Sequence, residues 1–172
     1  MDWIQTFTGR RFHPLAPDPA EVDITDIAHS LSLLCRFNGH CEAFYSVADH
    51  SVRVSRLLPG EHALAGLLHD AGEAYVSDLP RPVKKQVPAF DDMEDLVLRA
   101  VFDRFGLVFP YADAVRWADD VLLATEMRDL MTPAPEPWPL REAPTPERVV
   151  PLAPLEAERL FLARFEELTA AR

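Results

Sequence analysis

The sequence predicts an all-α fold, a compact helical bundle in a single domain. In most segments between proline and glycine turns, apolar residues recur at the spacing of an amphipathic helix. Strand and helix patterns do not alternate as they would in a parallel α/β sheet, and no segment of the sequence is repeated. A chain of 172 residues, 48% of them hydrophobic, is long enough to bury one core. We therefore expect one domain over residues 1–172, with its core at about 20–131.

The chain is expected to open with a short extended arm. Apolar and polar residues alternate around Thr8-Gly9, which favours a small hairpin. The first helix is expected to start at Asp23 and to stop at Asn38-Gly39. Thr25 and Asp26 are its alternative N-caps.

Two helices joined by a tight turn are expected next. Ser46 and Asp49 have the spacing of a capping box at the start of the first of them. Pro59-Gly60 marks the turn into the second, which we expect to run through residues 61–75. A loop that contains three prolines then follows at residues 77–88. The short turn predicts that the two helices pack antiparallel.

Three further segments complete the bundle. A helix is expected from residue 91 to Gly106, which is a natural C-terminal cap, and another at about 111–131. Between Pro133 and Pro154 there are eight prolines, which neither a helix nor a central strand accepts. We therefore expect an extended proline-rich connection at 132–154 and a final amphipathic helix at 155–172.

The charge of the chain restricts its partners. The formal charge is −11, with 28 acidic and 17 basic residues. Such a surface repels the phosphates of nucleic acids, so we expect no nucleic-acid polymer as a partner. A small anion can bind only where a metal ion or a local basic cluster reverses the field.

Cysteine usage and hydropathy indicate a cytoplasmic protein. Cys35 and Cys41 lie six residues apart, which matches neither a disulfide framework nor the spacing of a zinc site, so we expect reduced thiols. The first residues lack the layout of a signal peptide, and no apolar run is long enough to span a membrane. We expect no membrane partner, whereas a homo-oligomer remains open.

The pattern with the clearest chemistry lies on the expected helical hairpin. His50 precedes Pro59 by nine residues and His69 follows Gly60 by nine, so in an antiparallel pair both rise ~14 Å from the turn and meet. Asp70 follows His69 directly. Two imidazoles and a carboxylate suit a divalent transition metal such as Mn, Co, Zn, Fe or Ni. The small residue Gly66, one turn earlier, is expected to leave a hollow beside His69.

A fourth ligand is expected from the helix at 111–131. Asp119 has apolar neighbours on its own face of that helix, so its carboxylate should point inward. An inward carboxylate is costly unless a cation or hydrogen bonds compensate for its burial. Asp120 falls on another face, toward Arg116. It is expected either to be solvated or to contact the metal ligands without binding the metal itself. We therefore choose Asp119 as the metal ligand.

These residues carry a resemblance to a known superfamily. The order His50, His69-Asp70, Asp119 resembles the H…HD…D signature of the HD superfamily of metal-dependent phosphohydrolases. The run HDAGEAYVSDLPRPVK at 69–84 is similar to the HDxxE…DLPxPVK stretch of a narrower branch. That branch contains bacterial 5'-nucleotidases acting on deoxynucleoside monophosphates and phage enzymes that release triphosphate from dATP. CRFNGH followed by FYSVADHS also looks like the phage and prophage members, and the resemblance covers about residues 1–131.

The resemblance implies roles for the matching residues. The four residues of the signature match metal ligands, and an HD-domain bundle is the implied fold. Glu73 matches the acidic residue that orients or deprotonates the attacking water, and Asp78 matches a second carboxylate beside the scissile bond. Arg36 stands where the nucleotidases use an arginine against phosphate, and Lys84 matches the lysine of PVK.

Other residues near the expected site are assigned less sharply. For His40, contact with phosphate and packing of its loop remain alternatives. Arg81 and Lys85 are expected to be solvated. The hollow beside His69 is expected to hold the base or sugar under one of three aromatic caps: Phe37, Tyr45 or Trp117.

The implied activity is hydrolysis of a small (deoxy)nucleotide at one divalent metal ion. Monophosphates and triphosphates remain alternatives, because the spacing between His50 and His69 is shorter than in the monophosphatases of the branch. A non-catalytic nucleotide or metal sensor, a purely structural metal site, and an HD hydrolase of another nucleotide class such as guanosine tetraphosphate are the other hypotheses.

Overall fold

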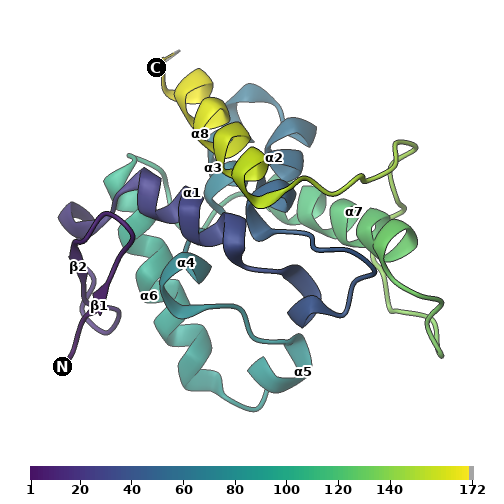
Figure 1. Cartoon of the computed structure of the whole chain (residues 1–172), viewed down its shortest axis with the longest axis horizontal. Coiled ribbons are helices and arrows are strands. Elements are labelled where there is room, and N and C mark those ends of the chain that lie inside the picture. The colour runs from purple at the N-terminus through teal and green to yellow at the C-terminus, as the bar shows by residue number, and fades with distance from the viewer. Residues whose placement is uncertain (171–172) are drawn as a thin grey trace.

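Helices form nearly all of the regular structure in the computed structural model, which describes residues 1–170 and confirms the all-α bundle (Figure 1). The α-helices are α1 (Ile24–Leu33), α2 (Val47–Leu57), α3 (Gly60–Leu68), α4 (Glu73–Val76), α5 (Arg81–Lys84), α6 (Pro88–Arg104), α7 (Asp113–Leu130) and α8 (Pro154–Ala170). Two 3-10 turns, η1 (Pro19–Glu21) and η2 (Arg36–Gly39), and the strands β1 (Ile4–Gln5) and β2 (Arg11–Phe12) complete the order. The last two residues of the expected final helix lie outside the described residues.

The N-terminal arm is the predicted hairpin, and it is fastened to the bundle. β1 and β2 pair antiparallel with Ile4 opposite Phe12. The Asp26 carboxylate accepts hydrogen bonds from the backbone N–H of Thr8 at 2.6 Å and from its hydroxyl at 2.9 Å. The N-cap of α1 is Asp23, whose carboxylate accepts a hydrogen bond from the backbone N–H of Thr25 at 2.9 Å, and not Thr25 or Asp26.

The first helix ends earlier than the sequence predicts. α1 stops at Leu33, because Cys35 then forms an isolated β-bridge with Ser46. The η2 turn follows, with Phe37, Asn38 and Gly39 all at positive φ. The expected stop signal Asn38-Gly39 therefore turns a loop and does not end a helix.

α2 and α3 form the predicted antiparallel pair. Ser46 caps α2, since its hydroxyl accepts a hydrogen bond from the backbone N–H of Asp49 at 3.1 Å. The expected hollow at Gly66 does not exist, because a Cβ placed there would lie 2.3 Å from Leu58 Cδ1. Gly66 instead allows α3 to approach α2 closely.

The expected helix at 61–75 is broken. α3 ends at Leu68, residues 69–72 form tight turns, and the one-turn helix α4 starts at Glu73. Gly72 lies against α6 here: a Cβ on it would sit 3.5 Å from the carbonyl oxygen of Glu94. The expected loop at 77–88 contains the short helix α5, and α6 starts at Pro88, which is earlier than expected.

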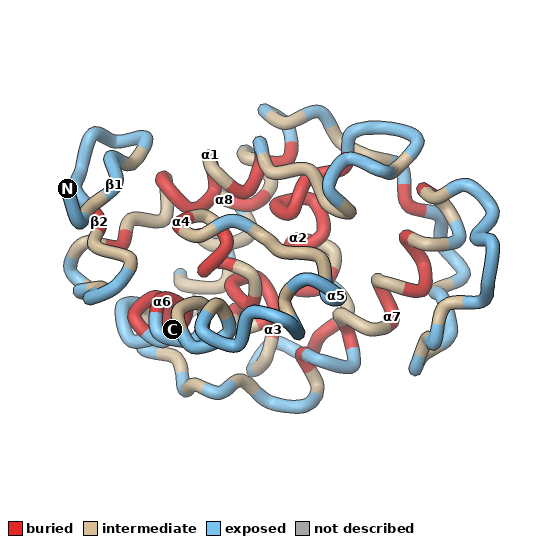
Figure 2. The backbone as a smooth tube through the Cα atoms, turned by 90° about the horizontal axis from the view of Figure 1, so that it is seen from below, coloured by how far each residue is buried: buried red, intermediate tan, exposed pale blue. Residues whose placement is uncertain are grey.

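The main core lies between α1, α2, α3, α6 and α8. α8 packs across α1, α2 and α3 (Figure 1), and its Phe161 is fully buried in the same cluster as Phe12 and Ile27. A second cluster, around Tyr45, joins α2 to α7. In Figure 2 the buried backbone runs through the middle of the bundle, whereas the loops at its ends are exposed. Within residues 1–170, no helix is long and apolar enough to cross a membrane.

Residues 132–153, which we call the strap, contain no helix or strand, as the prolines predict. The second half of the strap is tied to the bundle. Arg128 of α7 donates to the carbonyl oxygens of Thr145 and Glu147, and the backbone N–H of Val149 donates to Asp129 at 2.8 Å. The first half runs past the end of α7 and brings Trp138 near the η2 turn.

Candidate metal centre

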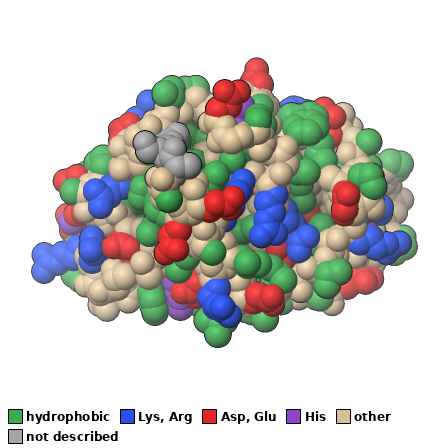
Figure 3. Space-filling model, turned by 90° about the horizontal axis from the view of Figure 1, so that it is seen from above, with side chains coloured by type: hydrophobic (Ala, Val, Ile, Leu, Met, Phe, Trp, Pro, Cys, Tyr) green, Lys and Arg blue, Asp and Glu red, His purple; other side chains and the backbone are tan. Residues whose placement is uncertain are grey.

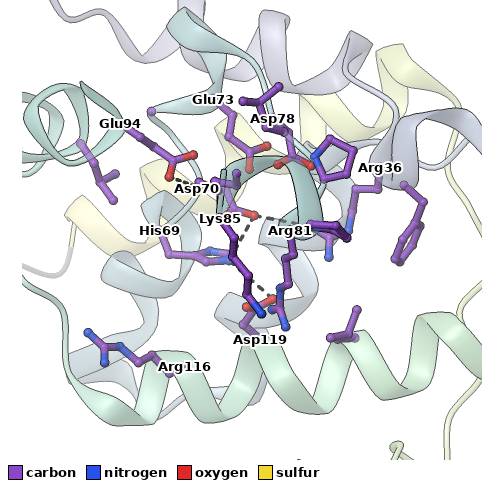
Figure 4. Close-up of a pocket in the computed structure, with 18 of the residues that line it drawn as sticks. Arg36, His69, Asp70, Glu73, Asp78, Arg81, Lys85, Glu94, Arg116 and Asp119 are labelled. Atoms are coloured by element: carbon purple, nitrogen blue, oxygen red, sulfur yellow. Dashed lines mark hydrogen bonds and ion pairs between the residues drawn. The ribbon is translucent and has the colours of Figure 1, made fainter. Parts of the chain in front are cut away.

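Four predicted ligands converge from three parts of the fold: α2, the turn after α3, and α7. The Nε2 atoms of His50 and His69 lie 3.3 Å apart. Asp119 Oδ1 lies 3.2 Å from His50 Nε2 and 4.0 Å from His69 Nε2. Asp70 Oδ2 lies 3.2 Å from His69 Nε2 and 3.7 Å from His50 Nε2. Figure 4 shows His69, Asp70 and Asp119 among the residues that line a pocket.

The hydrogen bonds of the two imidazoles define which nitrogen faces the centre. His69 Nδ1 lies 2.9 Å from the carbonyl oxygen of Gly66, which can only accept, so Nδ1 carries the proton. His50 Nδ1 lies 2.6 Å from Oε1 of Glu126, a carboxylate whose pKa is held below its ordinary value, because Arg36 and His50 together outweigh the effect of burial. With Nδ1 as the donor, each ring presents Nε2 toward the other and toward the carboxylates. This is the arrangement that metal-binding histidines adopt.

The donor set fits a divalent metal ion. Bonds of about 2.0–2.2 Å to one ion place its ligand atoms roughly 3–4 Å apart, as the Nε2 and Oδ atoms are here. Lone pairs at such separations repel one another unless a cation or protons lie between them. The buried group of His50, His69 and Asp119 could therefore hold a metal ion. Asp70 lies beside this group and also contacts Arg36.

The charges around the centre keep its carboxylates ionised. Burial alone raises the pKa of Asp119, but hydrogen bonding to His50 and the positive charges nearby lower it to about 2. Burial likewise raises the pKa of Asp70, and His69, His50 and Arg36 reverse that shift and bring it below its ordinary value. Burial and the charge of Arg36 lower the pKa of His50. Glu126 and Asp119 raise it by more than this, so the net effect is a pKa raised to about 9.

Asp119 and Asp120 have different neighbours in the structure. Asp119 faces the two histidines. The Asp120 carboxylate points elsewhere and lies 3.7 Å from Arg141 of the strap, so its partner is not Arg116.

Sequence comparison places the chain in a family. It is 41% identical over 175 residues, covering all of this chain and 98% of the relative, to the protein YfdR of Escherichia coli K12. It is 36% identical over 142 residues, covering 74% of this chain and 72% of the relative, to the protein RCAP_rcc00048 of Rhodobacter capsulatus. The chain belongs to the YfdR family. Both relatives carry the description uncharacterized protein, and no protein-family model matches the chain.

Beside the candidate metal centre of this YfdR-family chain lie the two acidic residues that the sequence singles out. Glu73 starts α4 and is 8% exposed, and its Oε2 atom has no hydrogen-bond partner among the described residues. Burial, followed by the charges of Asp70 and Asp78, raises the pKa of Glu73 well above its ordinary value. Burial and the charge of Asp70 also raise the pKa of Asp78. Glu73, Asp78 and Asp70 line one wall of the pocket (Figure 4).

The Arg36 guanidinium group is paired with carboxylates of the protein, whereas an arginine free to bind phosphate would lack such partners. Its Nε and Nη2 atoms lie 3.2 and 3.1 Å from Glu126 Oε2, and Nη1 lies 3.5 Å from Asp70 Oδ2. The side chain is 12% exposed and reaches the pocket wall. Its main contacts are thus with protein carboxylates.

Lys84, Arg81, Lys85 and His40 all line the pocket. Lys84 lines the pocket but forms an ion pair with Glu94 of α6, so its ammonium group has a protein partner. Arg81 and Lys85 are exposed, as expected, and both also line the pocket (Figure 4). His40 lines the pocket from the exposed η2 turn.

The pocket is a cleft of about 1690 Å³ between η2, α4 to α7 and the strap. Its described lining holds seven cationic side chains, Arg36, Arg81, Lys84, Lys85, Arg99, Arg116 and Arg141, and six acidic ones, Asp70, Glu73, Asp78, Glu94, Asp95 and Asp119. This balance contrasts with the formal charge of −11 for the whole chain. On the face drawn in Figure 3, acidic and basic side chains are interspersed, so that face carries no extended patch of one sign.

The aromatic lining of the cleft differs from the expectation. Phe37 lines it, and its ring lies 6.1 Å from that of Trp138 of the strap, edge to face. Tyr45 is fully buried behind the metal centre, and Trp117 is exposed outside the cleft, so neither is a cap. Trp138 was not singled out by the sequence because only the path of the strap brings it here.

Glu126 is a residue of the candidate metal centre that the sequence analysis misses. It is fully buried in α7 and contacts His50, Arg36 and Tyr45. A signal for it exists, because it follows Asp119 by seven residues, two helical turns later on the same face.

Proposed function

We propose that this YfdR-family chain is a metal-dependent phosphohydrolase of the HD superfamily that hydrolyses small (deoxy)nucleotides. The observation that carries the proposal is the position of Glu73: a buried carboxyl with a partnerless oxygen, in a cleft beside the His50, His69 and Asp119 group that could hold a metal ion and the adjacent Asp70. Buried polar atoms without partners are rare in folded proteins and concentrate at functional sites. The signature H…HD…D in the sequence points to the same superfamily.

His50, His69, Asp70 and Asp119 would hold one divalent transition metal ion, of the class Mn, Co, Zn, Fe or Ni. Such an ion, when bound, lowers the pKa of a water molecule and neutralises charge on a phosphate group. The nitrogen ligands favour these metals over Mg or Ca, which prefer oxygen.

Glu73 suits the role of general base and then acid. The pKa of Glu73 is raised above that of an ordinary carboxyl. A group accepts and returns a proton most efficiently when its pKa lies near the working pH of the enzyme. Asp78 shares this wall and keeps the pKa of Glu73 high through its negative charge. We assign proton transfer to Glu73 and an electrostatic role beside the reacting phosphate to Asp78.

The cleft supports an anionic, partly aromatic substrate. Arg81 and Lys85 form no ion pair among residues 1–170 and are available to a phosphate. The other end of the cleft, at Phe37 and Trp138, offers aromatic surface for a base. The volume of about 1690 Å³ accommodates a nucleoside mono- or triphosphate.

The test is an activity panel on the full chain. The protein is stripped with a chelator, reloaded separately with Mn, Co and Zn, and incubated with deoxynucleoside mono- and triphosphates, guanosine tetraphosphate and a cyclic dinucleotide. Metal-dependent release of phosphate, pyrophosphate or triphosphate from a deoxynucleotide, lost by ~10² or more in Glu73→Gln, supports the proposal. Nucleotide binding without turnover in the metal-loaded wild type would identify a sensor instead.

A further inference from the structure

One buried carboxylate connects the parts of the metal centre. Glu126 Oε1 accepts hydrogen bonds from His50 Nδ1 at 2.6 Å and from the Tyr45 hydroxyl at 2.9 Å. Its other oxygen, Oε2, accepts from Arg36 Nε at 3.2 Å and lies 3.1 Å from Arg36 Nη2. Both oxygens are therefore saturated by donors from three other segments of the chain, and the residue has no exposed surface.

Arg36 extends this connection to the opposite side of the centre. While Nε and Nη2 face Glu126, Nη1 lies 3.5 Å from Asp70 Oδ2. The planar guanidinium group fixes these directions relative to one another. One chain of contacts thus runs from His50 through Glu126 and Arg36 to Asp70, and links ligands that lie on different elements.

We infer that Glu126 and Arg36 are a positioning pair for the metal ligands: Glu126 holds the His50 ring with Nε2 toward the centre, and Arg36 holds Asp70 beside it. The inference rests on the proposed metal site and assigns Arg36 chiefly to the ligands and not to the substrate phosphate. A histidine whose second nitrogen donates to a carboxylate has its tautomer and orientation fixed and binds metal more strongly.

Glu126→Gln is the sharpest variant, because it keeps the shape and removes the charge. The amide has one acceptor oxygen and a donor NH₂ group, so it cannot accept from His50 and Arg36 together. Zn²⁺ affinity, measured by isothermal titration calorimetry on the chelator-stripped full chain, is expected to fall about 10- to 100-fold. Arg36→Lys keeps the charge but loses the fork, and its Zn²⁺ affinity is expected to fall about 10-fold.

Two controls separate positioning from general stabilisation. Asp26→Asn removes the charge of another buried carboxylate, whose partner is Thr8 of the hairpin, and is expected to lower the melting temperature of the metal-free protein. Tyr45→Phe removes one hydrogen bond to Glu126 and leaves those of His50 and Arg36 intact. Both controls are expected to keep Zn²⁺ affinity within about 3-fold of the wild type, which is smaller than the loss expected for a residue that orients a ligand.

A measurement on the wild type covers the case in which Glu126→Gln does not fold. In the zinc-loaded protein, ¹H–¹⁵N NMR of the imidazoles is expected to show a His50 ring with its proton on Nδ1, shifted downfield by the bond to Glu126. A His50 ring with its proton on Nε2 overturns the inference.

The calorimetry has three further decisive results. Zn²⁺ affinity within 3-fold of the wild type in Glu126→Gln overturns the positioning role while leaving the proposed hydrolase in place. An equal loss of affinity in Asp26→Asn also overturns it, because the effect then follows stability alone. A wild type that binds none of the metals overturns both the inference and the proposed function.

Discussion

The Nε2 atoms of His50 and His69 face each other at 3.3 Å, although the Nδ1 atom of each ring is held by a different acceptor. This geometry predicts that the folded protein gains stability from a bound metal ion. At a metal concentration 100 times the dissociation constant the gain is about 2.7 kcal/mol, which raises the melting temperature by roughly 5–10 °C for a chain of this size. Calorimetry with and without a chelator measures it.

Two neighbouring carboxylates provide the matched pair for that experiment. Asp119→Asn is expected to abolish the metal-dependent rise, because Asp119 Oδ1 lies 3.2 Å from His50 Nε2. Asp120→Asn is expected to keep it, since Asp120 contacts Arg141. A metal-dependent rise that survives in Asp119→Asn would contradict the assignment of this ligand.

The pH dependence of hydrolysis is expected to report on Glu73. A base must be ionised. Burial and the charge of Asp78, which is not one of the predicted metal ligands, raise the pKa of Glu73, so kcat/KM should fall on the acid side at a higher pH than an ordinary carboxyl would give. Asp78→Asn removes one of the negative charges and should move this acid limb to lower pH. If the pH at which kcat/KM falls is unchanged or higher in Asp78→Asn, Glu73 is excluded as the titrating base.

Basic residues of the cleft are expected to differ in their effects. Arg81→Ala and Lys85→Ala should raise KM for an anionic substrate by about 10-fold each with little change in kcat, because these side chains line the cleft and have no carboxylate partner among residues 1–170. Lys84→Ala should mainly lower the melting temperature, because it leaves Glu94 half-buried without its partner. Steady-state kinetics and thermal unfolding of the three variants distinguish these outcomes. A raised KM in Lys84→Ala, with KM unchanged in Arg81→Ala and Lys85→Ala, would instead identify Lys84 as the residue that contacts phosphate.

Trp138 is expected to affect substrate binding although it lies outside the helices. Trp138→Ala should raise KM by about 10-fold through loss of aromatic surface at the Phe37 end of the cleft, with kcat retained. Trp117→Ala is the matched control, since Trp117 is 47% exposed and does not line the cleft. Equal KM values in the two variants would show that Trp138 of the strap does not contribute to substrate binding.

Stability should depend on Gly66. Gly66→Ala places a Cβ 2.3 Å from Leu58 Cδ1 and also close to Val54, so overpacking is expected to cost about 1–3 kcal/mol. Gly60→Ala is the control, because nothing lies within 4 Å of its added Cβ. Chemical denaturation of the two variants measures the difference. A Gly66→Ala protein as stable as the wild type would show that the Leu58 side chain can move away from the added methyl group without cost.

The parts of the fold set by local sequence could be predicted. The turn at Pro59-Gly60 fixes the register of α2 against α3, and so the meeting of His50 and His69, because equal distances from a tight turn leave little freedom. The proline-rich strap follows from the missing backbone donors. The face of Asp119 follows from the helical period around it.

The features that the sequence did not reveal depend on partners far along the chain. The break after Leu68 accompanies the close approach of Gly72 to Glu94 on α6, which no local pattern announces. The sequence is equally compatible with a Lys84 that contacts a phosphate and one that pairs with Glu94. Only the packing of α5 on α6 selects the pair with Glu94. Glu126 could have been found by extending the Asp119 face two turns further.

The position of α8 has a consequence for biosynthesis. On the ribosome, every side chain that surrounds the metal centre is made before Phe161, which completes the core against α1, α2 and α3. Chains fold from the N-terminus during translation, and apolar surface left open in that interval invites aggregation. Nascent chains arrested between residues 130 and 154 should therefore be retained by chaperones, even though they already contain the whole ligand set.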